Sequence, residues 1–140
     1  MIGPPAPNPA PDPNPAIHRR LLDAIQAFVA AHPHPAVRRF GAAINDWGSD
    51  WTGVAPADLP AVRHLAPALA TAAPETRALA ALFTAERANR KWERTYDASD
   101  PVGAAMVAGY GYAEVIGARG PFISTRVRAG VGVWGPGLTY

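Results

Sequence analysis

Cysteine is absent from the 140 residues, which excludes a disulfide framework, a thiolate nucleophile and a cysteine metal site. Lysine is nearly absent as well, since Lys91 stands alone among 12 arginines. The net charge is +2, but the basic residues form no run, which argues against nucleic-acid binding. Met1 to Pro15 has no long apolar run, and this excludes a signal peptide or membrane span there. We expect a soluble, cytoplasmic protein.

The first residues are rich in proline, with seven prolines between Met1 and Pro15. Proline at every second position removes backbone donors and favours a solvated polyproline-like segment. We expect residues 1–15 to be a disordered tail, with binding of a PxxP-type partner as the lesser alternative. The remaining length suits a single domain.

Helical spacing dominates residues 16–109. Apolar residues recur every three or four positions over residues 16–31, which predicts an amphipathic helix that begins with Pro15 in its first turn. A second helix over 36–47 should pack against it as a hairpin. A short helix over 57–69, kinked or ended by Pro67, a longer one over 74–92 and one helical turn from about 101 to 109 should follow.

The pattern changes at Tyr110 to an alternation of period two, over 110–116 and again over 122–134, with a turn at 117–121. Helices followed by a sheet predict an α+β fold of four to five helices leading into antiparallel strands over 110–140. Two strands joined by a turn are marginal alone, so this sheet looks unfinished. Its open edge could allow self-association.

The segments GYGYAEVIGARGPFIS (109–124) and RVRAGVGVWGPGLTY (126–140) resemble the entry into the cupin barrel of bacterial dimethylsulfoniopropionate (DMSP) lyases. The ending WGPGxxY is the most distinctive part, and the helical portion with the WERTY linker (92–96) is similar too. The resemblance implies the first strands of a cupin-type barrel. In this family a histidine-rich motif follows the tyrosine, so the chain is expected to be an inactive N-terminal fragment that ends before the metal ligands.

The activity implied is metal-dependent β-elimination of DMSP to dimethyl sulfide and acrylate, with a divalent transition metal (Zn, Fe, Mn or Ni) in the complete family protein and none in this chain. Tyr140 matches the family's catalytic tyrosine and is the candidate base. A phenol has an ordinary pKa of about 10, which a nearby cation must lower before it acts as a base near neutral pH. The alternative is that Tyr140 is only a terminal residue.

Tyr110, Tyr112 and Trp134 are candidates to line a pocket for the substrate's sulfonium, because aromatic faces attract cations. Their other interpretation is ordinary packing within the sheet. Glu114 shares their strand face, which would place it in a polar lumen or at solvent, and it is expected to meet solvent or pair with Arg126 or Arg128.

The histidines show no metal-ligand spacing. The pair at positions 32 and 34 sits between prolines in a helix-breaking loop, and His18 and His64 are expected at helix surfaces or edges. The glycines at 130, 132, 135 and 137 have no phosphate-loop lysine, so they should serve bends and close backbone approach.

Three functions therefore remain open. The first is a DMSP lyase with a small sulfonium substrate. The second is another cupin metalloenzyme or a small-molecule sensor, because a fold does not fix a function. The third is a non-catalytic helical module whose open sheet edge pairs with another chain.

Overall fold

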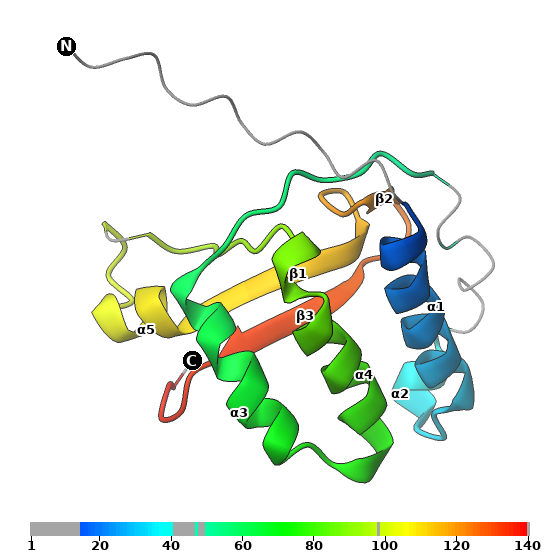
Figure 1. Ribbon diagram of the computed structural model, residues 1–140, viewed down its shortest axis with the longest axis horizontal. Helices are drawn as coiled ribbons and strands as arrows, with labels where there is room; N and C mark the ends of the chain where they lie inside the picture. Colours follow the sequence, from blue (N-terminus) through cyan, green and yellow to red (C-terminus); the bar gives the residue numbers. More distant parts are fainter. Residues whose placement is uncertain (1–14, 41–46, 48–49, 98, 140) are drawn as a thin grey trace.

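The computed structural model describes residues 15–40, 47, 50–97 and 99–139. Helices precede strands, which confirms the α+β fold (Figure 1). The α-helices are α1 (Pro15–Ala31), α2 (Pro35–Arg38), α3 (Leu65–Ala70), α4 (Pro74–Ala85) and α5 (Ala104–Gly109), and the 3-10 helices are η2 (Pro60–His64) and η3 (Arg87–Asn89). The strands are β1 (Tyr110–Gly117), β2 (Phe122–Ile123) and β3 (Ala129–Trp134). Within this part of the chain, no helix is long and apolar enough to cross a membrane.

Helix α1 confirms the strongest helical prediction. Its buried face is formed by Leu21, Leu22 and Ile25, at the expected spacing, together with His18. The expected helix at 36–47 is realised only as the short α2, which ends at Arg38 and contacts α1. Residues 41–46 lie outside the described residues, as do the proline-rich tail at 1–14 and Tyr140.

Two helix boundaries differ from the prediction. Helix α3 continues through Pro67 to Ala70, because η2 precedes it and leaves Pro67 in its first α-helical turn, where an amide N–H has no intrahelical partner. Helix α4 ends at Ala85 rather than near residue 92. The chain after it becomes extended, since the amide of Trp92 donates to the carbonyl of Ala57 (2.9 Å).

The sheet has three strands in the order β2-β1-β3, one more than the two expected from the sequence. Strand β1 pairs antiparallel with β3, whereas β2 pairs with β1 in parallel over two residues. Residues 124–128 separate β2 from β3 where one strand over 122–134 was expected. Among the described residues, the outer edge of β3 has no strand partner.

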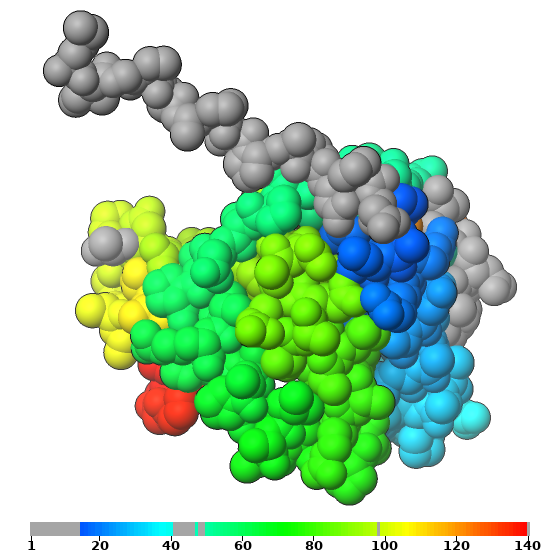
Figure 2. Space-filling model, viewed as in Figure 1, coloured from blue at the N-terminus to red at the C-terminus, as the bar shows by residue number. Residues whose placement is uncertain are grey.

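Helices cover one face of this sheet. Figure 1 shows α1, α3 and α4 on the near side of the strands, and in Figure 2 the same helices form much of the near surface. The covered face carries small and branched side chains, which pack in two buried clusters with α1, α4 and the segment 59–65. Its members include Ala113, Val115, Val131 and Val133. A bulge between Glu114 and Ile116 turns both Val115 and Ile116 into the core.

Candidate functional site

The face of the sheet opposite the helices carries the candidate site. Tyr110, Tyr112 and Glu114 alternate on this side of β1, and Trp134 lies directly across from Tyr110 in the antiparallel register. Facing positions on β3 are occupied by Gly130 and Gly132, which leave room above the strand. The result is a cavity of about 290 Å³ bounded by β1, β3 and Thr95.

Three aromatic rings converge at one end of this cavity. The ring centroids of Tyr110 and Trp134 are 5.1 Å apart, and those of Tyr110 and Tyr112 are 6.3 Å apart. Trp134 is 50% exposed although it sits within a strand, and its indole lies over Gly132. A Cβ atom at position 132 would come within 2.5 Å of that indole, so glycine is needed for the tryptophan to lie flat on the strand.

A fourth ring reaches the cluster from outside the sheet. Tyr96 stands 6.0 Å from Tyr110 between ring centroids, placed by the bridge in which Glu93 and Tyr112 exchange backbone hydrogen bonds of 2.8 Å. The next residue, Asp97, begins a turn closed by Ser99. Hydrogen bonds from the hydroxyl and amide of Ser99 hold the pKa of the Asp97 carboxyl below its ordinary value.

The other end of the cavity is ionic. Glu114 is 8% exposed, and its Oε1 atom accepts a 2.6 Å ion-pair contact from Nε of Arg128. Its Oε2 atom accepts a 2.9 Å hydrogen bond from the backbone amide of Arg119. The expected pairing of Glu114 with an arginine of the following strand region is thus confirmed, and the partner is Arg128. Glu114 thereby ties the turn after β1 to the approach to β3.

Two guanidinium groups meet at Tyr112. Arg119 Nη1 donates to the Tyr112 hydroxyl at 3.4 Å, and Arg128 Cζ lies 5.9 Å from the centroid of its ring. Aromatic side chains therefore surround the end of the cavity at Trp134, and positively charged side chains lie near its other end, toward the end of β1.

The structure brings together three of the four site residues that the sequence singled out. Tyr110, Tyr112 and Trp134 form one cluster, whereas Tyr140 lies outside the described residues. Sequence reasoning missed Tyr96 and Arg119. Tyr96 belongs to the WERTY linker, but nothing in its spacing indicates that the linker bridges to β1. Arg119 has the sequence context of an ordinary turn residue.

The ionisable groups of this cavity do not fit a metal ion. Glu114 contributes the only carboxylate of the lining, and both of its oxygens are already engaged. Across the described ranges 15–40, 47, 50–97 and 99–139, no three histidine, aspartate or glutamate side chains gather in a set that could hold a metal. The Nδ1 atoms of His32 and His34 each accept a backbone N–H at 3.1 Å.

The position of His18 corrects an expectation. It was expected at a helix surface, but it is 0% exposed and its ring packs 5.1 Å from that of Trp51. The imidazole of His18 is buried because it lies on the same face of α1 as the apolar side chains that pack against the core. His64 is half-buried, with its Nε2 atom close to Gly135.

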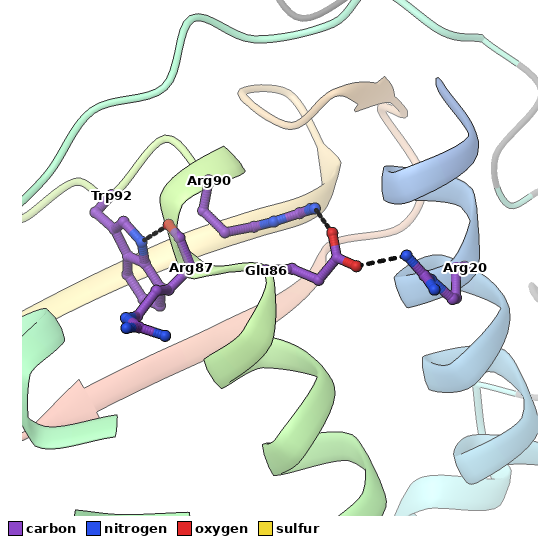
Figure 3. Close-up of polar contacts among 5 residues, drawn as sticks. All are labelled: Arg20, Glu86, Arg87, Arg90 and Trp92. Atoms are coloured by element: carbon purple, nitrogen blue, oxygen red, sulfur yellow. Dashed lines mark hydrogen bonds and ion pairs between the residues drawn. The ribbon is translucent and has the colours of Figure 1, made fainter. Parts of the chain in front are cut away.

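A second ionic cluster lies in the helical layer. Glu86, at the end of α4, accepts a 2.7 Å hydrogen bond from Arg20 of α1 and faces the buried Arg90 at 3.9 Å (Figure 3). Trp92 donates its indole N–H to the carbonyl of Arg87 at 2.9 Å. These contacts join α1, α4 and the extended segment after η3, which gives the cluster a structural role.

Both a family model and solved structures match this chain. The family model described as dimethylsulfoniopropionate lyase matches residues 35–140. A solved structure, titled as crystal structures of the DMSP lyases RdDddP and RnDddQII, superposes with a TM-score of 0.73 at 27% identity. The alignment covers 88% of this chain and 60% of the matched chain, so the present chain spans less than two thirds of that length. No curated protein matches significantly.

Proposed function

The chain belongs to the dimethylsulfoniopropionate lyase family, whose model covers residues 35–140, and on this premise we propose that its protein is a carbon-sulfur lyase acting on DMSP. The likeness to a solved DMSP lyase structure supports a partial cupin fold. In the proposed reaction a base removes the proton α to the carboxylate. The bond between the neighbouring carbon and sulfur then breaks, and dimethyl sulfide leaves with the electron pair to give acrylate.

The aromatic cluster is the observation that carries this proposal. A sulfonium is a cation without N–H donors, so it cannot be held by hydrogen bonds and is bound best by aromatic faces. Tyr110 and Trp134 present two such faces 5.1 Å apart, on the side of the sheet that the described helices leave open. Each face contributes roughly 0.5 to 2 kcal/mol, depending on how fully the cation is desolvated.

Tyr140 is the proposed base. The segment before it turns back at Gly137, whose φ of 76° suits glycine, and the amide of Gly135 donates to the carbonyl of Gly109 at 2.8 Å. Leu138 packs against Gly109. These contacts support the proposal because they direct the chain toward the start of β1, where Tyr110 lies.

The metal, the product and the location are finer points of the same proposal. The described residues supply aromatic and guanidinium groups and no ligand set, so the residues that bind a divalent metal would lie outside them. Acrylate follows from the elimination. A cytoplasmic location remains a prediction of the sequence.

The test measures dimethyl sulfide in the headspace and acrylate in solution. The protein is expressed with any coding sequence that follows Tyr140 and is loaded in turn with Zn, Fe, Mn and Ni. We expect both products in equal amounts with at least one metal. Failure to form either product under every loading contradicts the lyase assignment, and would leave a sensor or an interaction module as the remaining functions.

Tyr140→Phe is the informative variant in the same assay. Loss of a general base typically lowers kcat by about 10² to 10⁴-fold, so turnover should nearly vanish. Circular dichroism should show an unchanged fold. Retention of most of the wild-type kcat would mean that another group takes the proton.

A further inference from the structure

Helices α1 and α4 border a groove in the layer that covers the other face of the sheet. The two helices lie side by side in Figure 1 and are antiparallel. Arg20, near the start of α1, bonds to Glu86 at the end of α4. At the other end, His32 after α1 and Glu75 at the start of α4 both line the groove, whose volume is about 990 Å³.

The lining of this α1/α4 groove is apolar over its whole length. Phe28, Leu79 and Leu82 contribute half-buried side chains to it. Six alanines line it as well, three on each helix: Ala24, Ala27, Ala31, Ala78, Ala81 and Ala85. Among the described residues of the lining, His32 and Glu75 are the only ionisable ones. An exposed apolar surface of this kind marks an interaction site in a soluble protein.

The short side chains favour another helical surface as the occupant. Alanine projects little from a helix, so a second pair of helices can approach closely and pack ridges into the groove. Four of the six alanines are exposed, namely Ala27, Ala31, Ala78 and Ala85. A surface lined in this way by two antiparallel helices is complementary to a copy of itself, as in four-helix arrangements.

The charges at the two ends of the groove select the second copy. Glu75 is exposed and forms no ion pair with any residue that the structure describes. At the opposite end, Arg20 keeps 63% of its side chain exposed although it bonds to Glu86. Glu86 also faces the buried Arg90, so its charge is shared by two arginines. One end of the groove is therefore acidic, and the other presents an exposed guanidinium.

A twofold axis across the groove brings these ends together. Such an axis reverses the direction of the groove, so the Glu75 end of one copy faces the Arg20 end of the other. The groove also has the same length along both helices. Arg20 to Ala31 on α1 and Glu75 to Glu86 on α4 each span about 16 Å at the helical rise. Two acidic and two basic ends can therefore meet at once.

We propose that two copies of this chain associate through the α1/α4 groove, with each Glu75 facing Arg20 of the other copy. The apolar middle of the groove supplies the buried surface, and the two charge pairs fix the antiparallel orientation. The open face of the sheet, with Tyr110 and Trp134, stays accessible in this dimer. The inference therefore goes beyond the proposed function and does not depend on it.

The first experiment measures mass by light scattering after size exclusion, on the protein expressed as above. We expect wild type to have twice the mass of its polypeptide at micromolar concentration. Ala27→Glu should raise the dissociation constant about a hundredfold, because it places a carboxylate in the apolar contact of both copies. Ala30→Glu is the matched control, since Ala30 is equally exposed on α1 but lies outside the lining, and its dissociation constant should stay within twofold of wild type.

Glutamate is a good helix former, so both variants should keep the fold, which circular dichroism and a thermal melt check. A second variant tests the charges without touching the apolar middle. Glu75→Lys should raise the dissociation constant about tenfold, and added salt should reverse part of that loss, because the repulsion from Arg20 is screened. Asp58→Lys makes the same change at an exposed position away from the groove and should have no such effect.

Two results would overturn the inference. A wild-type protein that stays monomeric at every concentration would leave the groove to another protein or to another segment of the chain. A dimer that withstands both Ala27→Glu and Glu75→Lys would have its contact elsewhere, for example at the open edge of β3. The lyase assay separates the proposals, since a monomer that forms dimethyl sulfide contradicts only the dimer, and a dimer that forms none contradicts only the proposed function.

Discussion

The two faces of the same sheet are built from different side chains. The covered face presents alanine and valine to α1, α4 and the segment 59–65, whereas the open face presents tyrosine, tryptophan, glycine and one glutamate. Both come from the same two strands, β1 and β3, with period-two alternation deciding which residue goes where. The covered face therefore holds the fold together, and the open face is available for ligand chemistry.

The glycines make this division possible. Gly130 and Gly132 lie across from Glu114 and Tyr112, so large side chains on β1 meet none on β3. A sheet packed on both faces would fill these positions with branched residues. Here the space is used by the indole of Trp134 and by the cavity beside it. Stability and binding can therefore be altered separately, which the next three predictions test.

The largest expected effect is the difference in the free energy of unfolding between Leu22→Ala and Trp134→Ala. Leu22 is 0% exposed in the core between α1 and the covered face, so its truncation should lower the free energy of unfolding by about 2 to 5 kcal/mol. Trp134 is half-exposed, and its loss should cost less than about 1 kcal/mol while weakening DMSP binding. Urea denaturation and calorimetry provide the two measurements. Equal destabilisation by both variants would contradict the division between the faces.

A smaller effect should distinguish two neighbouring glycines. In Gly130→Ala the new Cβ would overlap the carbonyl oxygen of Ala113, a backbone atom that cannot move without separating the strands, and we expect a loss of about 1 to 3 kcal/mol. In Gly132→Ala the three atoms nearest to the new Cβ all belong to the Trp134 indole, which can swing into solvent. Its stability should change little, while the tryptophan fluorescence of the protein and the affinity for a sulfonium should both change. Thermal melts and titrations check the pair.

The smallest effect concerns the ionic end of the open face. Glu114→Gln removes the ion pair to Arg128 and weakens the hydrogen bond from the amide of Arg119, so it should cost about 1 to 2 kcal/mol. Glu93→Gln is the control, since the contact between Glu93 and Lys91 at 3.3 Å is partly exposed and worth less than about 1 kcal/mol. Denaturant titration compares the two. Equal losses would mean that Glu114 does not anchor the turn.

The local residue pattern was sufficient to predict a helix or strand whose structure depends mainly on its own residues. The spacing of Leu21, Leu22 and Ile25 predicted α1, and the alternation from Tyr110 predicted β1 and its aromatic side. The local pattern failed where the backbone bonds to a segment that is distant in the sequence. Helix α4 stops at Ala85 because the extended chain near Trp92 forms a backbone hydrogen bond with Ala57. No feature of residues 74–92 predicts that hydrogen bond.

The sequence by itself determined the α+β order, the two faces of the strands and the common face of Tyr110 and Tyr112, because periodicity is a property of neighbouring positions. Only the tertiary structure decided that Tyr96 joins these rings, that Arg119 returns to Tyr112 and that His18 is buried. Each depends on segments that are remote in the chain but adjacent in space. Such contacts follow from the packing of the whole domain, which no local pattern encodes.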